Sequence, residues 1–393
     1  MSETNAAWSS RASAHLMLVS AKPPIVMERG AGMELFDVEG RRYLDFIGGW
    51  AVDCLGHSPR ALAEALAEQS SRLVNASPSF WNRTQVELAE RLTAVTGLDK
   101  VWFGSTGAEA NEGAIKLARK WGSLRRAGAY EIITTVNSFH GRTLATMAAS
   151  GKEQWRALFA PPVPGFVHVP FDDLEALRAA VTDRTAAVMI ELVQGEGGAV
   201  PASPEYVLGL RALCDERHIL LILDEVQTGY GRTGSLFAFQ RYGVRPDVLT
   251  LAKGIGAGFP LSALLARDEF CVFQKGDQGG TYSGQPLAMA VGLAVLREIE
   301  RLDLPAHAAR IGSYLEDGLR RLERKGLLQH VRGAGLLLAF DATRRSAADV
   351  VAAALERGLI INSPRPASIR LIPPLIAERG HIDEAIAVLE QVL

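Results

Sequence analysis

The stretch Pro246–Pro260 reads PDVLTLAKGIGAGFP, and its lysine is the residue hardest to explain as ordinary structure. The apolar part is bounded by turn residues and has the length of a buried strand, where a charged side chain is costly to place. Lys253 ends this apolar run and opens a glycine-rich turn. A lysine in such a position is either paired with an anion or bound to an aldehyde cofactor as a Schiff base.

A second apolar run supplies a candidate partner for this lysine. The segment Leu220–Gly229 reads LLILDEVQTG and places Asp224 29 residues before Lys253. Ligands of open α/β sheets bind outside the carboxyl ends of the strands. A lysine and a carboxylate at neighbouring strand ends match pyridoxal phosphate: the lysine binds its aldehyde, and the carboxylate keeps its pyridine nitrogen protonated. The competing interpretation, that Asp224 only caps a turn, does not account for Lys253.

The pattern around these segments predicts an α/β fold in three parts. Residues 1–45 are expected to form an arm and a hairpin, with the turn at Glu39-Gly40. Residues 46–265 alternate strand and helix patterns, which favours a large, mostly parallel sheet covered by helices. Residues 266–393 favour a smaller α+β domain. Expected strands in the large domain are Val101–Phe103, Glu131–Val136, Ala187–Glu191 and Ile219–Leu223, between helices such as Pro59–Arg72, Thr84–Thr96 and Gly107–Trp121.

Composition narrows the functional class. The 393 residues carry a net charge of −2 with no clustered basic excess, so no nucleic-acid partner is expected. Three scattered cysteines form neither a disulfide framework nor a metal-binding motif, so we expect no metal site. No apolar stretch has the length of a membrane span. We therefore expect a soluble, cytoplasmic protein.

Four further segments carry chemistry-bearing residues. The segment Phe103–Glu112 reads FGSTGAEANE and places small residues at a helix N-terminus, where backbone N–H groups bind phosphate. The segment Ser138–Thr143, SFHGRT, offers an aromatic ring and an arginine past a strand end. Glu191–Gly198 brings two carboxylates into a glycine-rich loop, and Gly279–Pro286 offers hydroxyl groups suited to phosphate. Each of these motifs taken alone is more often ordinary loop structure.

Taken together and in this order, the segments resemble the class III aminotransferases of pyridoxal-phosphate fold type I. The acetylornithine and ornithine aminotransferase branch is the most similar, and the resemblance runs from Tyr43–Phe46 to Ile369–Leu375. It implies a seven-stranded type of sheet and a homodimer with active sites at the subunit interface. It also implies transfer of a terminal amino group from N-acetylornithine or a close analogue to 2-oxoglutarate, giving a semialdehyde and glutamate by a ping-pong mechanism. Arginine biosynthesis is the pathway this branch suggests, although the residues do not fix it.

The resemblance also implies a role for each matching residue. Lys253 and Asp224 would be catalytic and would hold the cofactor. Further cofactor contacts would come from Thr106, Gly107, Ala108, Phe139, His140, Val226 and Gln227, and Thr281 would reach the cofactor of the neighbouring subunit. Arg142 would bind a substrate carboxylate and Arg370 the α-carboxylate of glutamate. Glu196 would pair with Arg370 when the ω-amine substrate is bound.

Some residues depart from the family pattern and leave the substrate open. Trp50 stands where ornithine-type enzymes tend to carry a tyrosine and acetylornithine-type enzymes a small aliphatic residue, so it either narrows the acyl pocket or packs on the substrate. Other class III outcomes therefore remain: an ornithine, 4-aminobutyrate or lysine-derived aminotransferase, an aminomutase or a decarboxylase. A non-catalytic descendant is disfavoured because Lys253 and Asp224 are both present. A nucleotide-binding oxidoreductase is disfavoured because Phe259-Pro260 interrupts the helix that Gly254–Gly258 would have to open.

Overall fold

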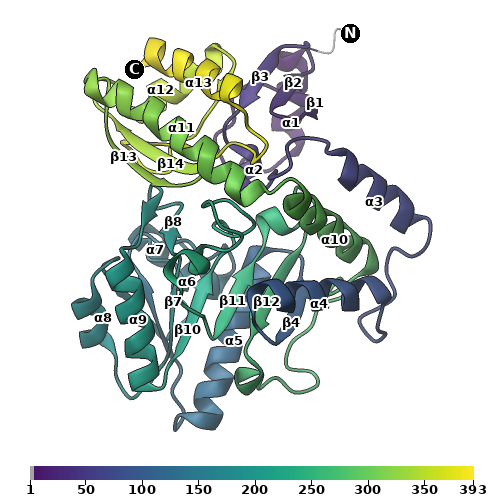
Figure 1. Cartoon of the computed structure of the whole chain (residues 1–393), viewed down its shortest axis with the longest axis vertical. Coiled ribbons are helices and arrows are strands. Elements are labelled where there is room, and N and C mark those ends of the chain that lie inside the picture. The colour runs from purple at the N-terminus through teal and green to yellow at the C-terminus, as the bar shows by residue number, and fades with distance from the viewer. Residues whose placement is uncertain (1–3) are drawn as a thin grey trace.

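The computed structural model describes residues 4–393, apart from the side chain of Arg156, so the first three residues of the predicted 1–45 arm lie outside it. A seven-stranded sheet forms the centre of the larger lobe (Figure 1), in the order β4-β12-β11-β10-β7-β5-β6. These strands are β4 (Lys100–Gly104), β5 (Glu131–Thr135), β6 (Phe166–Val169), β7 (Thr185–Ile190), β10 (Leu220–Asp224), β11 (Val248–Leu251) and β12 (Ser262–Ala266). Only β12 is antiparallel to its neighbours in this sheet. The mostly parallel α/β fold predicted from the sequence is confirmed.

Side-chain alternation explains why helices cover both faces of this sheet. In β10, Leu220 and Ile222 pack on one face with α5 (Gly107–Arg125), whereas Leu221 and Leu223 pack in the cluster on the other face. A strand that is apolar on both sides can be buried only between two layers. The remaining helices of this lobe are α3 (Arg60–Ser70), α4 (Arg83–Thr96), α6 (Leu144–Ala149), α7 (Glu153–Leu158), α8 (Leu174–Ala180), α9 (Pro204–Arg217) and α10 (Pro286–Arg301).

The two ends of the chain meet in the smaller lobe (Figure 1). The N-terminal strands β1 (Met27–Ala31), β2 (Glu34–Asp37) and β3 (Arg42–Asp45) form a sheet with β15 (Leu359–Ile360), which pairs with β3 in parallel. A second sheet contains β13 (Leu328–Ala334), β14 (Leu337–Ala342) and β16 (Ser368–Leu371). This lobe also contains α1 (Asn5–His15), α11 (Leu304–Arg324), α12 (Ala347–Glu356) and α13 (Arg379–Val392). The short pair β8 (Val193–Gln194) and β9 (Val200–Pro201) follows β7 of the larger lobe, and β9 contacts β13. The hairpin turn at Glu39-Gly40 forms as predicted, while the domain limits at 45 and 265 stay predictions.

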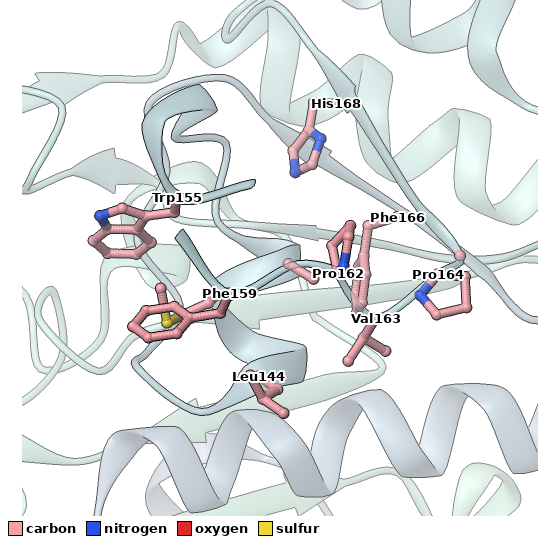
Figure 2. A pocket seen from close by; sticks show the side chains of 11 residues that line it. Leu144, Trp155, Phe159, Pro162, Val163, Pro164, Phe166 and His168 are labelled. Atoms are coloured by element: carbon pink, nitrogen blue, oxygen red, sulfur yellow. The ribbon is translucent and has the colours of Figure 1, made fainter. Parts of the chain in front are cut away.

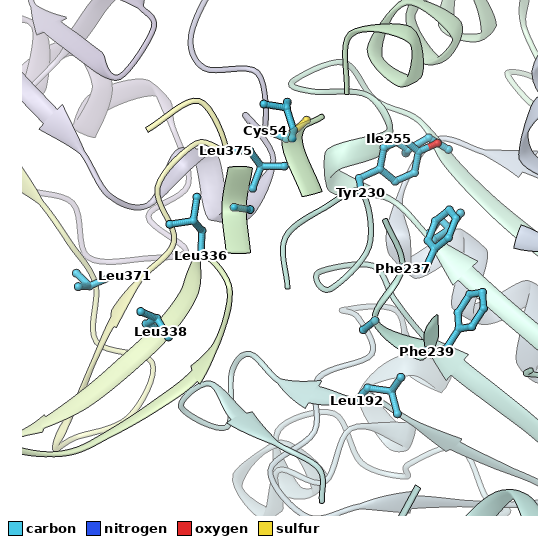
Figure 3. Packing of buried hydrophobic residues seen from close by; sticks show 14 of the residues in the cluster. Cys54, Leu192, Tyr230, Phe237, Phe239, Ile255, Leu336, Leu338, Leu371 and Leu375 are labelled. Carbon is cyan, nitrogen blue, oxygen red and sulfur yellow. The ribbon is translucent and has the colours of Figure 1, made fainter. Parts of the chain in front are cut away.

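One hydrophobic cluster joins the two lobes. Figure 3 shows Leu336, Leu338 and Leu371 of the smaller lobe on one side and Tyr230, Phe237 and Phe239 of the larger lobe on the other, all in the same buried cluster. Fully buried Arg232 reinforces the junction, because its Nη1 donates to the carbonyl oxygens of Leu336, at 3.0 Å, and Pro373. This packing fixes the position of β16, and with it Arg370, against the end of the large sheet.

Among residues 4–393, no helix is both long and apolar enough to cross a membrane.

Candidate active site

A cavity of about 480 Å³ lies past the carboxyl ends of β5, β10 and β11 and the first turn of α5. Most of the site residues predicted from sequence line it: Thr106, Gly107, Ala108, Phe139, His140, Arg142, Glu196, Asp224, Val226, Gln227 and Lys253. Arg370 is not itself a lining residue but is paired with Glu196 of the lining, and Trp50 packs against Arg370. Thr281 is not among the lining residues. The position agrees with the rule that open α/β sheets bind ligands beyond the ends of their strands.

Lys253 occupies a strained backbone position. It follows β11 after one residue and has a φ of 48°, in the left-handed region that a side chain disfavours. Burial lowers the pKa of its amine, and nearby Arg370 lowers it further, although Glu196 and Asp224 act in the opposite direction. An amine with a lowered pKa is more often unprotonated and therefore a better nucleophile and base. Strain of this kind persists only where the surrounding structure enforces it.

Asp224 is held by a buried network. Its Oδ2 lies 2.7 Å from Nδ1 of His140 and accepts a hydrogen bond of 2.8 Å from Asn111, while its Oδ1 accepts one of 3.0 Å from the backbone N–H of Val226. Burial alone would lower the pKa of His140, but the hydrogen bond to Asp224 and the charges of Asp224 and Glu191 raise it above its usual value. The network keeps the carboxylate of Asp224 oriented.

Asn111 is the member of this network that was not predicted from the sequence. Its amide also donates to the backbone carbonyl oxygen of His140, at 2.7 Å, so it ties α5 to the loop after β5. The residue lies within the FGSTGAEANE motif, one helical turn after Gly107, and this i, i+4 spacing places both on one face of the helix. This spacing from Gly107 is the sequence feature from which a role for Asn111 in the site could have been predicted.

The N-terminus of α5 forms a cradle for an anion. Thr106 is its N-cap, and Glu109 accepts hydrogen bonds from the backbone N–H groups of Ser105, at 2.9 Å, and Thr106, at 2.8 Å. The N–H groups of the first helical turn, at Gly107 and Ala108, have no acceptor within the helix and line the cavity. A side chain at Gly107 would bring its Cβ to 2.9 Å from Val226, so glycine keeps this cradle open.

Arg370 and Glu196 form an ion pair at one side of the cavity. Nη1 of Arg370 lies 2.8 Å from Oε1 of Glu196 and 3.3 Å from the side-chain oxygen of Gln227. Burial raises the pKa of Glu196, but Arg370 and Lys253 outweigh it, so the net pKa is lowered and the carboxylate stays charged. Arg370 is fully buried, and its Nη2 has no hydrogen-bond partner among the described residues.

Trp50 covers this ion pair from a left-handed turn. The guanidinium carbon of Arg370 lies 5.7 Å from the centre of the indole ring. Gly48, Gly49, Trp50 and Ala51 all have positive φ angles, between 52° and 67°. Asp45 fastens the start of the turn by accepting hydrogen bonds from the N–H groups of Ile47, at 2.7 Å, and Gly48, at 3.1 Å. The element labelled α2 (Gly48–Ala51) is therefore a turn that aims the indole.

Phe139 and Glu191 form a further part of the cavity lining. Glu191 accepts a hydrogen bond of 3.0 Å from the backbone N–H of Phe139, and burial raises the pKa of its carboxyl group to about 7. The Phe139 ring meets the Trp155 ring edge to face, with centres 5.7 Å apart. The guanidinium carbon of Arg142 lies 4.8 Å from the centre of the Trp155 ring. Trp155, which packs against Phe139 and lines the neighbouring pocket, was not indicated by the sequence.

Comparison with known proteins decides the family. The model of the class-III aminotransferases matches residues 17–393. This chain belongs to the class-III aminotransferases. The family depends on pyridoxal phosphate, and the residues of this aminotransferase fit that cofactor, because Lys253, Asp224 and the anion cradle of α5 line one cavity. Both the recognised family and the cofactor predicted from the sequence are confirmed.

Individual relatives of this class-III aminotransferase carry related names. It is 52% identical over 363 residues to acetylornithine aminotransferase 2 of Bordetella pertussis, covering 92% of each chain. Among solved structures it resembles ornithine aminotransferase of Toxoplasma gondii, with a TM-score of 0.96, 32% identity and coverage of 100% of this chain and 94% of that one. It also resembles an (S)-enantioselective ω-transaminase of Thermomicrobium roseum, with a TM-score of 0.94, 33% identity and coverage of 100% and 99%.

Proposed function

We propose that this aminotransferase moves the terminal amino group of N-acetylornithine or a close analogue to 2-oxoglutarate, in two half-reactions that share one cavity. The observation that carries the proposal is the Glu196–Arg370 ion pair of 2.8 Å at the cavity that Arg142 also lines. A free guanidinium would penalise a substrate without a carboxylate at that position, and the ion pair neutralises it. When the pair opens, Arg370 can bind the α-carboxylate of glutamate. The name of the Bordetella pertussis relative supports the same donor.

The residues of the chain have distinct roles in this proposal. Bound pyridoxal phosphate supplies an electron sink for the carbon that bears the substrate amine. Lys253 would hold the cofactor, and its Nζ, whose lowered pKa suits it to exchange protons, would carry the proton. Asp224, oriented by His140 and Asn111, would pair with the pyridine nitrogen. Gly107, Ala108 and Thr106 would hold the phosphate at the start of α5.

The remaining cofactor and substrate contacts follow from the walls of the cavity. Val226 and Phe139 would cover the two ring faces of the cofactor, and Gln227 would reach the oxygen on its ring. Arg142 would bind the α-carboxylate of the amine donor, while Trp50 would limit the space available to its acyl group.

A homodimer is part of the proposal because Thr281 lies outside the cavity. Thr281 is exposed and follows a glycine pair, and its neighbour Tyr282 is 63% exposed. Phe80 and Trp81 are 69% and 86% exposed, and Asn82, next to them, donates a hydrogen bond of 2.8 Å to the carbonyl oxygen of Gly284. An apolar surface of this kind beside a candidate phosphate ligand is expected to be covered by a second subunit, whose cofactor Thr281 would reach. A cytoplasmic location stays a prediction.

Other class III reactions are the alternatives. An ornithine, 4-aminobutyrate or lysine-derived donor would use the same cavity without the acyl group. The likeness to an ω-transaminase makes a donor without any carboxylate worth testing, but Arg142 would then lack a ligand. An aminomutase would turn over its substrate without added keto acid, whereas the proposed enzyme requires 2-oxoglutarate.

The test is a half-reaction panel on the pyridoxal-phosphate-loaded enzyme. N-acetylornithine, ornithine, 4-aminobutyrate and lysine are each added without a keto acid, and the loss of visible absorbance is followed. We expect the fastest loss with N-acetylornithine or another N-acyl ornithine, and recovery when 2-oxoglutarate is added. Faster reaction with 4-aminobutyrate, or no recovery with 2-oxoglutarate, would refute the proposal.

A further inference from the structure

Lys152 stands beside the cavity as a second cation on the Phe139–Trp155 wall. Its Nζ lies 5.1 Å from the centre of the Phe139 ring and 4.9 Å from that of Trp155. Arg142 contacts the same two rings, with its Cζ at 5.8 Å and 4.8 Å from their centres. Two positive groups therefore share one aromatic wall.

Both cations contact aromatic rings. In the part of the chain that the structure describes, neither forms a salt bridge with a carboxylate. Behind Trp155 lies a second, apolar pocket of about 240 Å³, lined by residues such as Leu144, Phe159 and Phe166, and no residue of its lining carries a carboxylate (Figure 2). Two carboxylates act electrostatically on Lys152: Glu196 is already paired with Arg370, and Glu191 accepts a hydrogen bond from the backbone N–H of Phe139.

Two positive groups on the same pair of rings repel each other, and this repulsion points to an anionic ligand that would bind between them. Burial lowers the pKa of Lys152, and the positive charges of Arg142 and Arg370 lower it further against the opposing effect of Glu196 and Glu191. One carboxylate is fully satisfied by a single guanidinium, which binds it in a bidentate manner. A donor with one carboxylate would thus occupy Arg142 and leave the ammonium of Lys152 without an anion.

We propose that Arg142 and Lys152 form a two-cation site for a donor whose distal end carries two carboxylates. Arg142 binds the α-carboxylate, and Lys152 binds the terminal carboxylate of a dicarboxylic acyl group, such as succinyl, on the α-nitrogen. This inference rests on the proposed function and narrows it from N-acyl ornithines in general to N-succinyl-type donors.

The first test measures binding apart from turnover. N-succinylnorvaline and N-acetylnorvaline lack the terminal amine and cannot react, so their dissociation constants on the cofactor-loaded enzyme report the distal site alone. We expect tighter binding of the succinyl compound, and an approximately tenfold loss of that affinity in Lys152→Met, as expected for one charge-assisted contact. Lys152→Met keeps an unbranched, uncharged chain on the two rings, and Lys152→Arg should retain most of the affinity. Lys325→Gln, at the residue that follows α11, is the control for loss of a distant lysine.

The second test compares transamination of N-succinylornithine and N-acetylornithine. Lys152→Met should raise the KM for the succinyl donor about tenfold, leave its kcat nearly unchanged and leave both constants for the acetyl donor within about twofold. An equal loss for both donors would mean that Lys152 shares the α-carboxylate with Arg142, and no loss for either would mean that it binds neither; both results overturn the inference. If no amine donor reacts with the wild type, the proposed function fails, while the norvaline measurement still decides the two-cation site.

Discussion

Lys253 is the residue on which the chemistry depends, and its replacement gives the first prediction. Lys253→Ala should lose the visible absorbance that pyridoxal phosphate gives with the wild-type protein, and transamination should fall by at least about 10²–10⁴-fold, because the variant lacks both the attachment point and the proton carrier. Absorbance spectra and a coupled glutamate assay check this, with exposed Lys325→Ala as the control. A visible band that persists in Lys253→Ala would place the attachment elsewhere.

Glu191 provides a prediction about pH. Its folded pKa of about 7 exceeds the ordinary value of 4.5, because it is buried. Between these values the folded protein holds a proton that the unfolded chain has released, so the contribution of Glu191 to stability is complete below about pH 4.5 and is lost as the pH rises through about 7. Glu191→Gln removes this loss. The Tm of the variant relative to wild type should therefore rise from about pH 5 to about pH 8.

The control for this pH effect is Glu205→Gln, which replaces an exposed glutamate on α9. Thermal unfolding is followed for both variants at the two pH values. A Tm difference for Glu191→Gln that is the same at both would contradict the raised pKa.

Sequence reasoning at this scale identified residue types but not their orientations. Lys253 and Asp224 were predictable because a charge at the end of an apolar strand has few explanations. Asn111 and Lys152 were not, since an amide on a helix and a lysine in a loop are common, and only the fold brings them to Asp224 and to the Phe139–Trp155 wall.

At the scale of elements, the left-handed turn that carries Trp50 yields a paired prediction. Gly40 and Gly49 both have positive φ angles, 81° and 58°, but a Cβ on Gly40 would meet nothing within 4 Å, whereas one on Gly49 would lie 2.5 Å from Oδ2 of Asp53. Gly40→Ala should cost about 1 kcal/mol from backbone strain alone. Gly49→Ala should lower the free energy of unfolding further and raise the KM for the donor, because the displaced turn moves Trp50. Denaturant titration measures the free energy of unfolding of both variants, and steady-state kinetics measures their KM. Equal effects of the two substitutions would show that the Asp53 side chain can move aside without cost.

Helices were predicted well where the periodic pattern of apolar residues extends over several turns. The helices expected at Thr84–Thr96 and Gly107–Trp121 form at Arg83–Thr96 and Gly107–Arg125. Strands β6 and β12 were not predicted: β12 (SALLA) directly follows the Phe259–Leu261 segment, and its small residues give no distinct strand pattern. Its place is set by hydrogen bonding to β11 and β4, which is a property of the assembled sheet.

At the scale of the whole molecule, the proposed sharing of Thr281 between subunits predicts complementation. Thr281→Asp should weaken cofactor binding by repelling the phosphate, and Lys253→Ala should be inactive. When both variants are co-expressed, the mixed dimer contains one site with an intact Lys253 and an intact Thr281 from the partner subunit, so activity should recover to about a quarter or more of wild type. Activity no higher than that of Thr281→Asp alone would mean that each subunit uses its own threonine.

The pairing of β3 with β15 has a consequence for how this protein is made. Strand β3 ends at Asp45 and its neighbour β15 begins at Leu359, so the ribosome must translate nearly the whole chain, roughly 15–60 s of synthesis, before that sheet can be completed. Until then the hairpin exposes an unpaired strand edge, which is a template for pairing with other chains. Nascent or truncated chains that stop before Leu359 are therefore expected to need chaperones and to aggregate when expressed alone.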